Sequence, residues 1–369
     1  MAKKGKYQKQ KPRKAAGFKK TILITLAVIL VLVCGLCAFG VAYYYDLLGY
    51  VSRAEISEQE LSDEELKDIL GYVPETLPET EPVPTEETES TQPKESKYGK
   101  IVNIMLVGQA RREEEDSKLS DTMILVTINK ETKTLTLTSF LRDLYVKLPN
   151  YKNHVCGMQR INVAYNLGWR WAGDLGGMEM LDQLILENFG VEVDHNVEIN
   201  FESFKSLIDL MGGVTLDLTQ AEADYINMTG FNLQAGTNTL NGDAALEYAR
   251  MRKSDGSDSD FHRTARQRNL ITILLKRCMS MSLSEINDLL KTALPMVLTD
   301  MSDEEITTLM VELLPLLPEL TIESVQIPAE GTYYGDMVQI GGMDAAVLKC
   351  DVEANREILV KLCEESDSR

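Results

Sequence analysis

Five arginines lie within nineteen residues of a strongly acidic chain: Arg250, Arg252, Arg263, Arg266 and Arg268. The 369 residues carry a formal net charge of −19, so the cluster runs against the general charge of the protein. Planar guanidinium groups bind phosphate oxygens through paired hydrogen bonds, and clustered arginines are therefore typical of phosphate and pyrophosphate sites. The cluster predicts a site for an anionic ligand.

Two short elements would position these side chains. The Ala-rich run 240–249 predicts a helix, and an extended segment after it would place Arg250 and Arg252 on the same side. Asp260 is a suitable N-cap for a second helix, on which Arg263, Arg266 and Gln267 share one face. The start of that helix would add backbone N–H groups and a positive dipole end to the site. Arg268 points away from this face and is expected to be solvated.

The neighbouring aspartates support a different interpretation of the arginines. Asp255, Asp258 and Asp260 lie in the same stretch, and ion pairs on a solvated face contribute little energy. These aspartates imitate a calcium loop, but the Gly and the final Glu that such a loop requires are missing. The chain also lacks a P-loop, a nucleophile elbow and a zinc-helix motif, and its three histidines are scattered.

The N-terminal part of the chain predicts a membrane anchor. Residues 1–20 contain nine Lys or Arg and no Asp or Glu, and the apolar run that follows supports a transmembrane helix at 21–45. The positive flank places the N-terminus in the cytoplasm and the rest of the chain outside. We therefore expect a single-pass protein of the cell membrane whose main domain is extracellular.

The remainder of the chain divides into an acidic linker and one large domain. Residues 46–97 are rich in Glu, Pro, Thr and Ser, which predicts an extended tether that includes a short helix near its beginning. Beyond residue 20 the chain holds 57 acidic residues against 29 basic ones, about −28, so nucleic acid is excluded as a partner. Residues 98–369 are sufficient for one domain.

The domain 98–369 is predicted to be α/β, with a mixed central sheet between helical layers. Continuous apolar runs and alternating patterns predict six strands, at 101–108, 123–128, 134–139, 193–199, 214–218 and 321–327. Helical periodicity predicts six helices, at 175–189, 201–211, 260–281, 283–294, 302–314 and 344–363. Cys156, Cys278, Cys350 and Cys363 match no zinc pattern and are expected to be buried thiols, although a Cys350–Cys363 disulfide is an alternative.

Three acidic and basic residues lie at strand ends. Asp121 immediately precedes the second strand, and Arg142 and Asp143 follow the third, where the binding loops of open sheets gather. The Leu-rich segment 283–317 is explained either by core packing or by the wall of a tunnel for a lipid chain.

The chain contains five short motifs in this order: Ser120-Asp121-Thr122, Arg142-Asp143, Arg160-Ile161-Asn162, Tyr248-Ala249-Arg250-Met251-Arg252 and Asp260-Phe261-His262-Arg263 to Gln267. Their order and spacing resemble those of the LytR-CpsA-Psr family. The resemblance is detailed over residues 101–277. Members of this family are cell-wall enzymes of Gram-positive bacteria. They transfer a glycopolymer, such as wall teichoic acid or a capsular polysaccharide, from undecaprenyl pyrophosphate to peptidoglycan through a phosphodiester bond.

The resemblance implies a role for each site residue. Arg142, Arg250, Arg252 and Arg263 would hold the pyrophosphate with support from Gln267 and Arg266, and the polyprenyl tail would lie in an apolar tunnel. Asp121 would hold Mg²⁺, while Asp143 would orient Arg142 or accept the proton of the attacking hydroxyl. Arginines and a hard cation neutralise charge in phosphoryl transfer without covalent catalysis, which agrees with this assignment.

The chain departs from the family pattern at the metal side of the site. Ala110 stands where relatives carry a second metal-binding aspartate, and Leu119 where they carry an arginine before Ser-Asp-Thr. The proline usual before Arg-Asp is replaced by Leu141. A phosphotransferase is therefore the leading hypothesis. The alternatives are a catalytically weakened protein that binds polyprenyl-phosphate lipids and a polyprenyl pyrophosphatase.

Overall fold

The computed structural model describes residues 48–76, 99–109, 119–150, 154–252 and 260–364. The chain divides into two compact units, Met1–Tyr50 and Val51–Arg369, and the description below concerns the second. The predicted cytoplasmic tail and the predicted anchor at 21–45 lie outside the described residues. Within those residues, no helix has both the length and the apolar character needed to cross a membrane.

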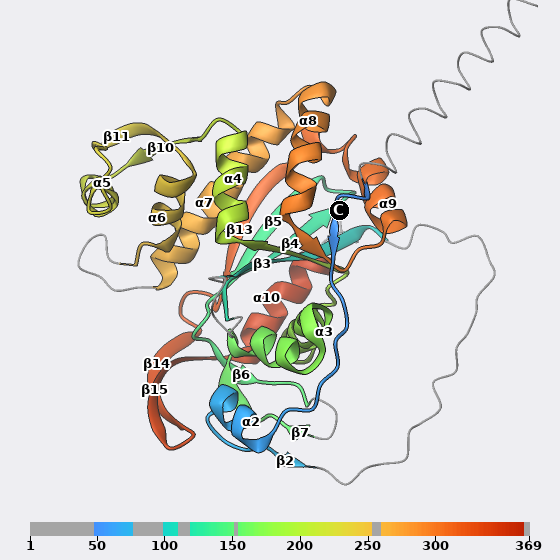
Figure 1. Cartoon of the computed structure of the whole chain (residues 1–369), viewed down its shortest axis with the longest axis vertical. Helices are drawn as coiled ribbons and strands as arrows, with labels where there is room; N and C mark the ends of the chain where they lie inside the picture. The colour runs from blue at the N-terminus through green and yellow to red at the C-terminus, as the bar shows by residue number, and fades with distance from the viewer. Residues whose placement is uncertain (1–47, 77–98, 110–118, 151–153, 253–259, 365–369) are drawn as a thin grey trace, which may run out of the picture. The chain divides into compact units, whose positions relative to one another are not determined.

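A seven-stranded mixed sheet forms the centre of the domain (Figure 1). Its order is β1 (Ser52–Arg53), β12 (Leu298–Thr299), β9 (His195–Asn200), β3 (Ile101–Gln109), β4 (Ser120–Asn129), β5 (Thr134–Phe140) and β13 (Thr321–Ile327). The central strands β3, β4 and β5 pair antiparallel, whereas β9 joins β3 and β13 joins β5 in parallel. The mixed sheet predicted from the sequence is thus confirmed, and β4 is apolar on both faces because both are covered.

Two helical layers cover the sheet (Figure 1). On one face, Met123 and Leu125 of β4 share a core with α3 (Val163–Phe189) and α10 (Val352–Glu364). On the other face, Ile124 and Val126 pack against α7 (Asp260–Met279). Successive side chains of β4 point to opposite faces of the sheet and are therefore buried in two different cores. Helices α8 (Leu283–Ala293) and α9 (Asp303–Leu313) follow α7 in the chain, and two short 3₁₀ helices, Leu294–Met296 and Leu317–Glu319, lie close to them in sequence.

A smaller core lies beside the sheet. It combines α4 (Phe201–Leu210), the antiparallel pair β10 (Val214–Leu218) and β11 (Gly236–Leu240), α5 (Gln220–Asn227), α6 (Gly242–Arg250) and the middle of α7. Polar residues begin these helices: Asn200, Thr219 and Asn241 each cap one by accepting a backbone N–H. Helix α6 therefore starts at a fixed point and delivers Arg250 at its last turn.

The predicted linker 46–97 contains folded residues, which corrects its description as a tether. Strand β1 pairs with β12, β2 (Glu75–Thr76) pairs with β7 (His154–Val155), and α2 (Asp63–Leu70) lies between them in the chain. Leu66 and Leu70 of α2 are buried in the core that contains α3. An amphipathic helix in an acidic segment can dock in this way because its two apolar side chains fall on one face. Residues 77–98 therefore connect two segments of the same domain.

The predicted helix 344–363 is wrong in its first part. Residues Met343–Cys350 form β15, which pairs with β14 (Tyr333–Ile340) in a hairpin, and helix α10 begins only at Val352. The turn Gly341-Gly342 supplies two positive φ angles, which favour a hairpin over a helix at this point. A second short pair, β6 (Tyr145–Lys147) with β8 (Met158–Arg160), lies near the base of the hairpin.

Among the described residues, the four cysteines of the domain form no disulfide. Cys156 is buried, and Cys278, Cys350 and Cys363 are partly buried. The alternative of a Cys350–Cys363 disulfide is therefore not borne out.

Candidate functional site

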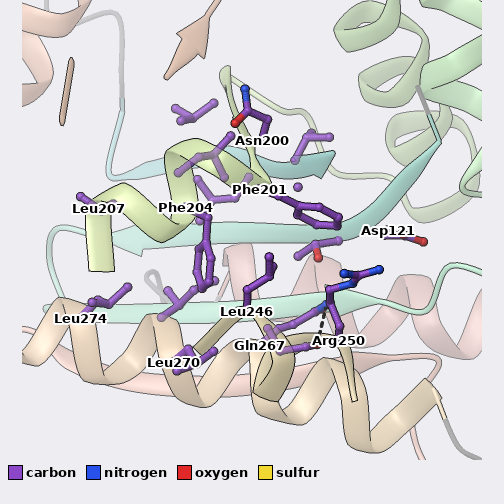
Figure 2. Close-up of a pocket in the computed structure, with 18 of the residues that line it drawn as sticks. Asp121, Asn200, Phe201, Phe204, Leu207, Leu246, Arg250, Gln267, Leu270 and Leu274 are labelled. Carbon is purple, nitrogen blue, oxygen red and sulfur yellow. Dashed lines mark hydrogen bonds between the residues drawn. The ribbon is translucent and has the colours of Figure 1, made fainter. Parts of the chain in front are cut away.

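A cavity of ≈ 920 Å³ lies between the sheet and the helices α4, α6, α7 and α8. One end is polar and carries Asp121, Arg250, Arg252, Arg263 and Gln267. Figure 2 shows Arg250 and Asp121 at this end, with Leu207 and Leu274 at the other. The cavity therefore offers a charged mouth and an apolar body to one ligand.

The apolar body is lined by three helices. Phe201, Phe204 and Leu207 line it from α4, Leu270 and Leu274 from α7, and Leu289, Leu290 and Ala293 from α8. The i, i+3 and i+4 spacings place each set on one helix face, turned toward the same space. The Leu-rich segment 283–317 divides between two environments: α8 lines the cavity, whereas Leu313, Leu316 and Leu317 pack against the core formed by β4 and β5.

Arg250 and Arg252 lie exposed at the cavity mouth. Arg250 ends α6, and the chain becomes extended at Met251, so both arginines line the same cavity. The guanidinium carbon of Arg250 lies 5.1 Å from the centre of the Phe201 ring, a cation–π contact that orients the side chain. Within the described residues, neither arginine forms a salt bridge. Both side chains place positive charge beside the cavity.

Asp121 and Arg142 form the centre of a charged network behind the mouth. Arg142 Nη1 donates to Asp121 Oδ1 at 3.0 Å, and Arg142 Nε lies 3.5 Å from Asp143 Oδ2. Arg263, which is only 3% exposed, lies 2.7 Å from Asp260 Oδ1 and donates to the Asp121 carbonyl oxygen at 3.3 Å. Arg142 thereby connects a carboxylate of the large cavity with Asp143 and Asp260, which line a second, smaller cavity.

Burial and neighbouring charges set the pKa values in this network. Burial raises the pKa of Asp260 above its ordinary value, and the nearby Arg263 and Arg142 only partly offset that effect. Burial alone would lower the pKa of Arg142, but Asp143 and Asp121 reverse the direction and hold it above its usual value. Arg142 is therefore a permanent cation, fixed by carboxylates on several sides.

The remaining predicted residues of α7, Arg266, Gln267 and Arg268, lie in different surroundings. Gln267 lines the cavity, whereas Arg142 and Arg266, which were also predicted to contact the pyrophosphate, do not. Arg266 Nε donates to Glu222 Oε1 at 2.8 Å, and its Nη1 donates to the Met251 carbonyl oxygen at 3.0 Å. Arg266 therefore supports the backbone between Arg250 and Arg252. Arg268 is half-buried rather than solvated, and burial lowers the pKa of its guanidinium.

Asp121 offers a single carboxylate to a metal ion. Ala110 lies outside the described residues, and among those described no group of three His, Cys, Asp or Glu side chains could hold a metal. Mg²⁺ often binds one or two carboxylates together with substrate phosphates, so Asp121 fits Mg²⁺ in combination with a bound pyrophosphate. Leu119, two residues away, is 40% exposed and brings no charge to this side.

Several residues of the site were not identified from the sequence. Phe201 and Phe204 belong to a helix that was predicted, but no sequence signal showed that its apolar stripe faces a cavity. Asp260 was interpreted as an N-cap or as one of the aspartates of a solvated salt-bridge face, but its side chain is only 17% exposed and contacts both Arg142 and Arg263. Glu222 carries no local signal, because its pairing with Arg266 spans 44 residues.

Fold and cavity together define a class of protein: an α/β domain whose cavity is charged at its mouth and apolar in its body. The chain belongs to the LytR_cpsA_psr family, whose model matches residues 75–353.

Among curated proteins, the chain is 35% identical over 210 residues to the polyisoprenyl-teichoic acid–peptidoglycan teichoic acid transferase TagU of Oceanobacillus iheyensis. That alignment covers 57% of this chain and 62% of the relative. Among solved structures, TagT bound to LIIa-WTA is similar with a TM-score of 0.56 at 23% identity, over 74% of this chain and 94% of that one. A further structure, YwtF (TagT) with bound octaprenyl pyrophosphate lipid, has a TM-score of 0.51 at 21% identity, over 74% and 93% of the two chains.

Proposed function

We propose that this protein is a membrane-anchored phosphotransferase of the Gram-positive cell envelope. It transfers a glycopolymer of the teichoic acid or capsular type from a polyprenyl pyrophosphate carrier to peptidoglycan and forms a phosphodiester bond. The observation that carries the proposal is a single cavity with an arginine-rich mouth and an apolar body. Two further findings support the same reaction. The chain belongs to the LytR_cpsA_psr family, and its TagU relative is named a teichoic acid transferase.

The cavity suits the two halves of such a donor. The polyprenyl chain lies along α4, α7 and α8, where burial of apolar surface contributes about 25 cal/mol per Å². The pyrophosphate lies at the mouth, where Arg250 and Arg252 are unpaired within the described residues and Arg263 is held in place by Asp260. Positive charge fixed before the ligand arrives stabilises the charge that develops during phosphoryl transfer.

The reaction needs one proton acceptor. Asp143 is the suitable group, because a third of its side chain is exposed and its distances to Arg142 and Arg160 exceed hydrogen-bond length. The acceptor hydroxyl gives its proton to Asp143, and its oxygen forms a bond to the phosphorus that carries the glycopolymer. The bond from that phosphorus to the bridging oxygen breaks, and polyprenyl phosphate leaves.

We propose Mg²⁺ as the cofactor, with Asp121 as its protein ligand. When bound, the ion would neutralise charge on the pyrophosphate oxygens. Because Asp121 contributes one carboxylate, the affinity for Mg²⁺ should depend on the presence of the lipid pyrophosphate.

The proposed location is the cell membrane, with the N-terminus in the cytoplasm and the main domain outside. It rests on the basic tail 1–20 and the apolar run at 21–45.

A transfer assay tests the proposal. The full-length protein in detergent, with lipid-linked polymer, Mg²⁺ and a peptidoglycan glycan as acceptor, should form polymer joined to the glycan. Arg142→Ala and Arg263→Ala should each lower lipid binding by about tenfold or more, since each removes a charged hydrogen-bond donor. Unchanged binding in both variants would exclude the pyrophosphate site.

Leu119 and Ala110 favour a second candidate, a protein that binds the lipid without turnover. Absence of transfer by the wild type, together with transfer by an Ala110→Asp, Leu119→Arg double variant, would support this candidate over the phosphotransferase. Release of phosphate from a short-chain polyprenyl pyrophosphate, with water as acceptor, would instead indicate a pyrophosphatase.

A further inference from the structure

A second cavity of ≈ 170 Å³ lies next to the charged network. It is lined by Leu141, Asp143, Asp260, Phe261 and residues 346–348 of β15. Its walls come from the loop after β5, the start of α7 and strand β15 of the β14–β15 hairpin. It is much smaller than the first cavity, which suits one small ring rather than a long chain.

The walls of this second cavity are fixed by contacts of their own. Leu348 donates its backbone N–H to the Asp143 carbonyl oxygen at 2.9 Å, which fixes the hairpin to the loop. The rings of Phe261 and Tyr333 stack with their centres 4.7 Å apart, which fixes the hairpin to α7. The cavity is therefore a stable part of the fold rather than a gap beside a loose hairpin.

Chemistry and position both indicate the ligand. Asp143 offers a partly exposed carboxylate that accepts hydrogen bonds from hydroxyl groups, while Phe261, Val347 and Leu348 offer apolar surface to the C–H faces of a ring. A sugar presents both kinds of surface. Arg142 joins the two cavities by contacting Asp121 on one side and Asp143 on the other.

We propose that the second cavity binds the acceptor sugar of the glycan strand and brings one of its hydroxyls to Asp143. This inference rests on the proposed transfer reaction and adds the acceptor site to it. The donor then occupies the large cavity and the acceptor the small one, with Arg142 between them. Asp260 is a positioning residue, because its carboxylate oxygens are buried and lie toward Arg263 and Arg142.

Kinetics of the full-length protein with a soluble glycan oligosaccharide test this inference. Ala346→Trp, at an exposed residue of the cavity rim, should raise KM for the acceptor by about tenfold while the affinity for the lipid donor stays within about twofold. Met343→Trp is the matched control, since Met343 is exposed on the same hairpin but does not line the cavity. It should keep the wild-type acceptor KM.

Phe261 provides an independent variant if Ala346→Trp does not fold. Phe261→Leu removes the aromatic ring and should raise acceptor KM, whereas Phe261→Tyr keeps the ring and should restore it. A wild-type protein without transfer activity would overturn the proposed function. A wild type that transfers, with unchanged acceptor KM in the variants at both Ala346 and Phe261, would overturn the acceptor site alone.

Discussion

The arginines between 250 and 268 differ in what surrounds each guanidinium group. Arg250 and Arg252 are exposed at the cavity mouth, Arg263 is buried against Asp260, and Arg266 is buried against Glu222. The mouth arginines line the cavity, whereas the charge of Arg266 is paired with Glu222 within the fold. Identical side chains should therefore respond differently to the same substitution.

Arg250→Ala should weaken binding of polyprenyl pyrophosphate by about tenfold and leave the melting temperature within about 1 °C, because an exposed cation is lost. Isothermal titration calorimetry and thermal unfolding of the same samples measure both quantities.

Arg266→Ala is the contrasting substitution. It leaves Glu222 half-buried without its cation and removes a donor to the Met251 carbonyl oxygen, so we expect a destabilisation of about 3 kcal/mol. The pKa of Glu222, which the Arg266 hydrogen bond lowers against the opposing effect of burial, should rise. A variant that binds lipid poorly but unfolds like the wild type would contradict this structural role.

The sequence predicted the residue types of the site better than their roles. Helical spacing correctly grouped Arg263 with Gln267, because neighbours at i+4 share a face whatever the fold. It could not separate Arg266 from them, because the partner of Arg266 lies on α5, and pairing across the chain is decided by tertiary packing.

At the scale of elements, α8 and α9 show that similar composition does not imply similar function. Leu289, Leu290 and Ala293 of α8 line the cavity, while α9 contributes Leu313 to the core on the sheet. The two helices differ in what their apolar faces contact: that of α8 faces the cavity, and that of α9 faces the core on the sheet. Substitutions on the cavity face of α8 should therefore change the affinity for a donor lipid, whereas substitutions on the exposed face of α9 should not.

Leu290→Trp should lower affinity for a long polyprenyl pyrophosphate more than for a short one, since the larger ring narrows the apolar body. The measurement is the ratio of dissociation constants for a C55 and a C15 lipid, which we expect to shift by about tenfold. Val311→Trp on α9, at a residue 70% exposed, is the control and should leave the ratio unchanged. An equal loss for both lipids would place the tail elsewhere.

The five longer strands of the central sheet were predicted closely, because continuous apolar runs have few alternatives to a covered strand, whereas the two-residue strands β1 and β12 were not predicted. The hairpin at 333–350 was missed because its exposed strands lack a buried face of their own. Its tip instead packs against α2: a Cβ on Gly341 would lie 1.7 Å from the Gly71 carbonyl oxygen. Contacts between residues so far apart in the chain leave no local pattern, which also explains why α2 was assigned to a tether.

At the scale of the whole molecule, a group of buried and partly buried polar residues lies at the junction of α3, β9 and β12. Asn196 donates from Nδ2 to Asp182 Oδ2 at 2.7 Å and to Asp300 Oδ2 at 3.1 Å. Burial raises the pKa of Asp182 to about 8, with further contributions from Asp300 and Glu179. Asp182 is therefore largely protonated in the folded protein at neutral pH.

The sign of the resulting pH dependence follows directly. Unfolded Asp182 loses its proton near its ordinary pKa of 3.8, whereas folded Asp182 keeps it up to about pH 8. The free energy of unfolding should therefore decrease as the pH rises from about 4 to about 8. Above pH 8 both states have lost the proton, so the full destabilisation by the buried carboxylate should be present. Asp182→Asn carries no titrating proton, so it should flatten this decline and raise the melting temperature at pH 8.5 by several degrees.

Thermal unfolding between pH 5 and pH 9 checks the prediction, with Glu323→Gln at an exposed position of β13 as control. A decline of the same slope in Asp182→Asn would mean that another group titrates.

One wall residue of the large cavity gives the protein a chemical reporter. Cys278 lines the cavity as a free thiol, and burial raises its pKa, so little reactive thiolate is present at neutral pH. A small apolar alkylating reagent should therefore modify it slowly, and a resident lipid should block the reaction altogether. The rate at which Cys278 is alkylated, followed by peptide mass spectrometry, would therefore distinguish molecules that hold a lipid from empty molecules in a mixed preparation.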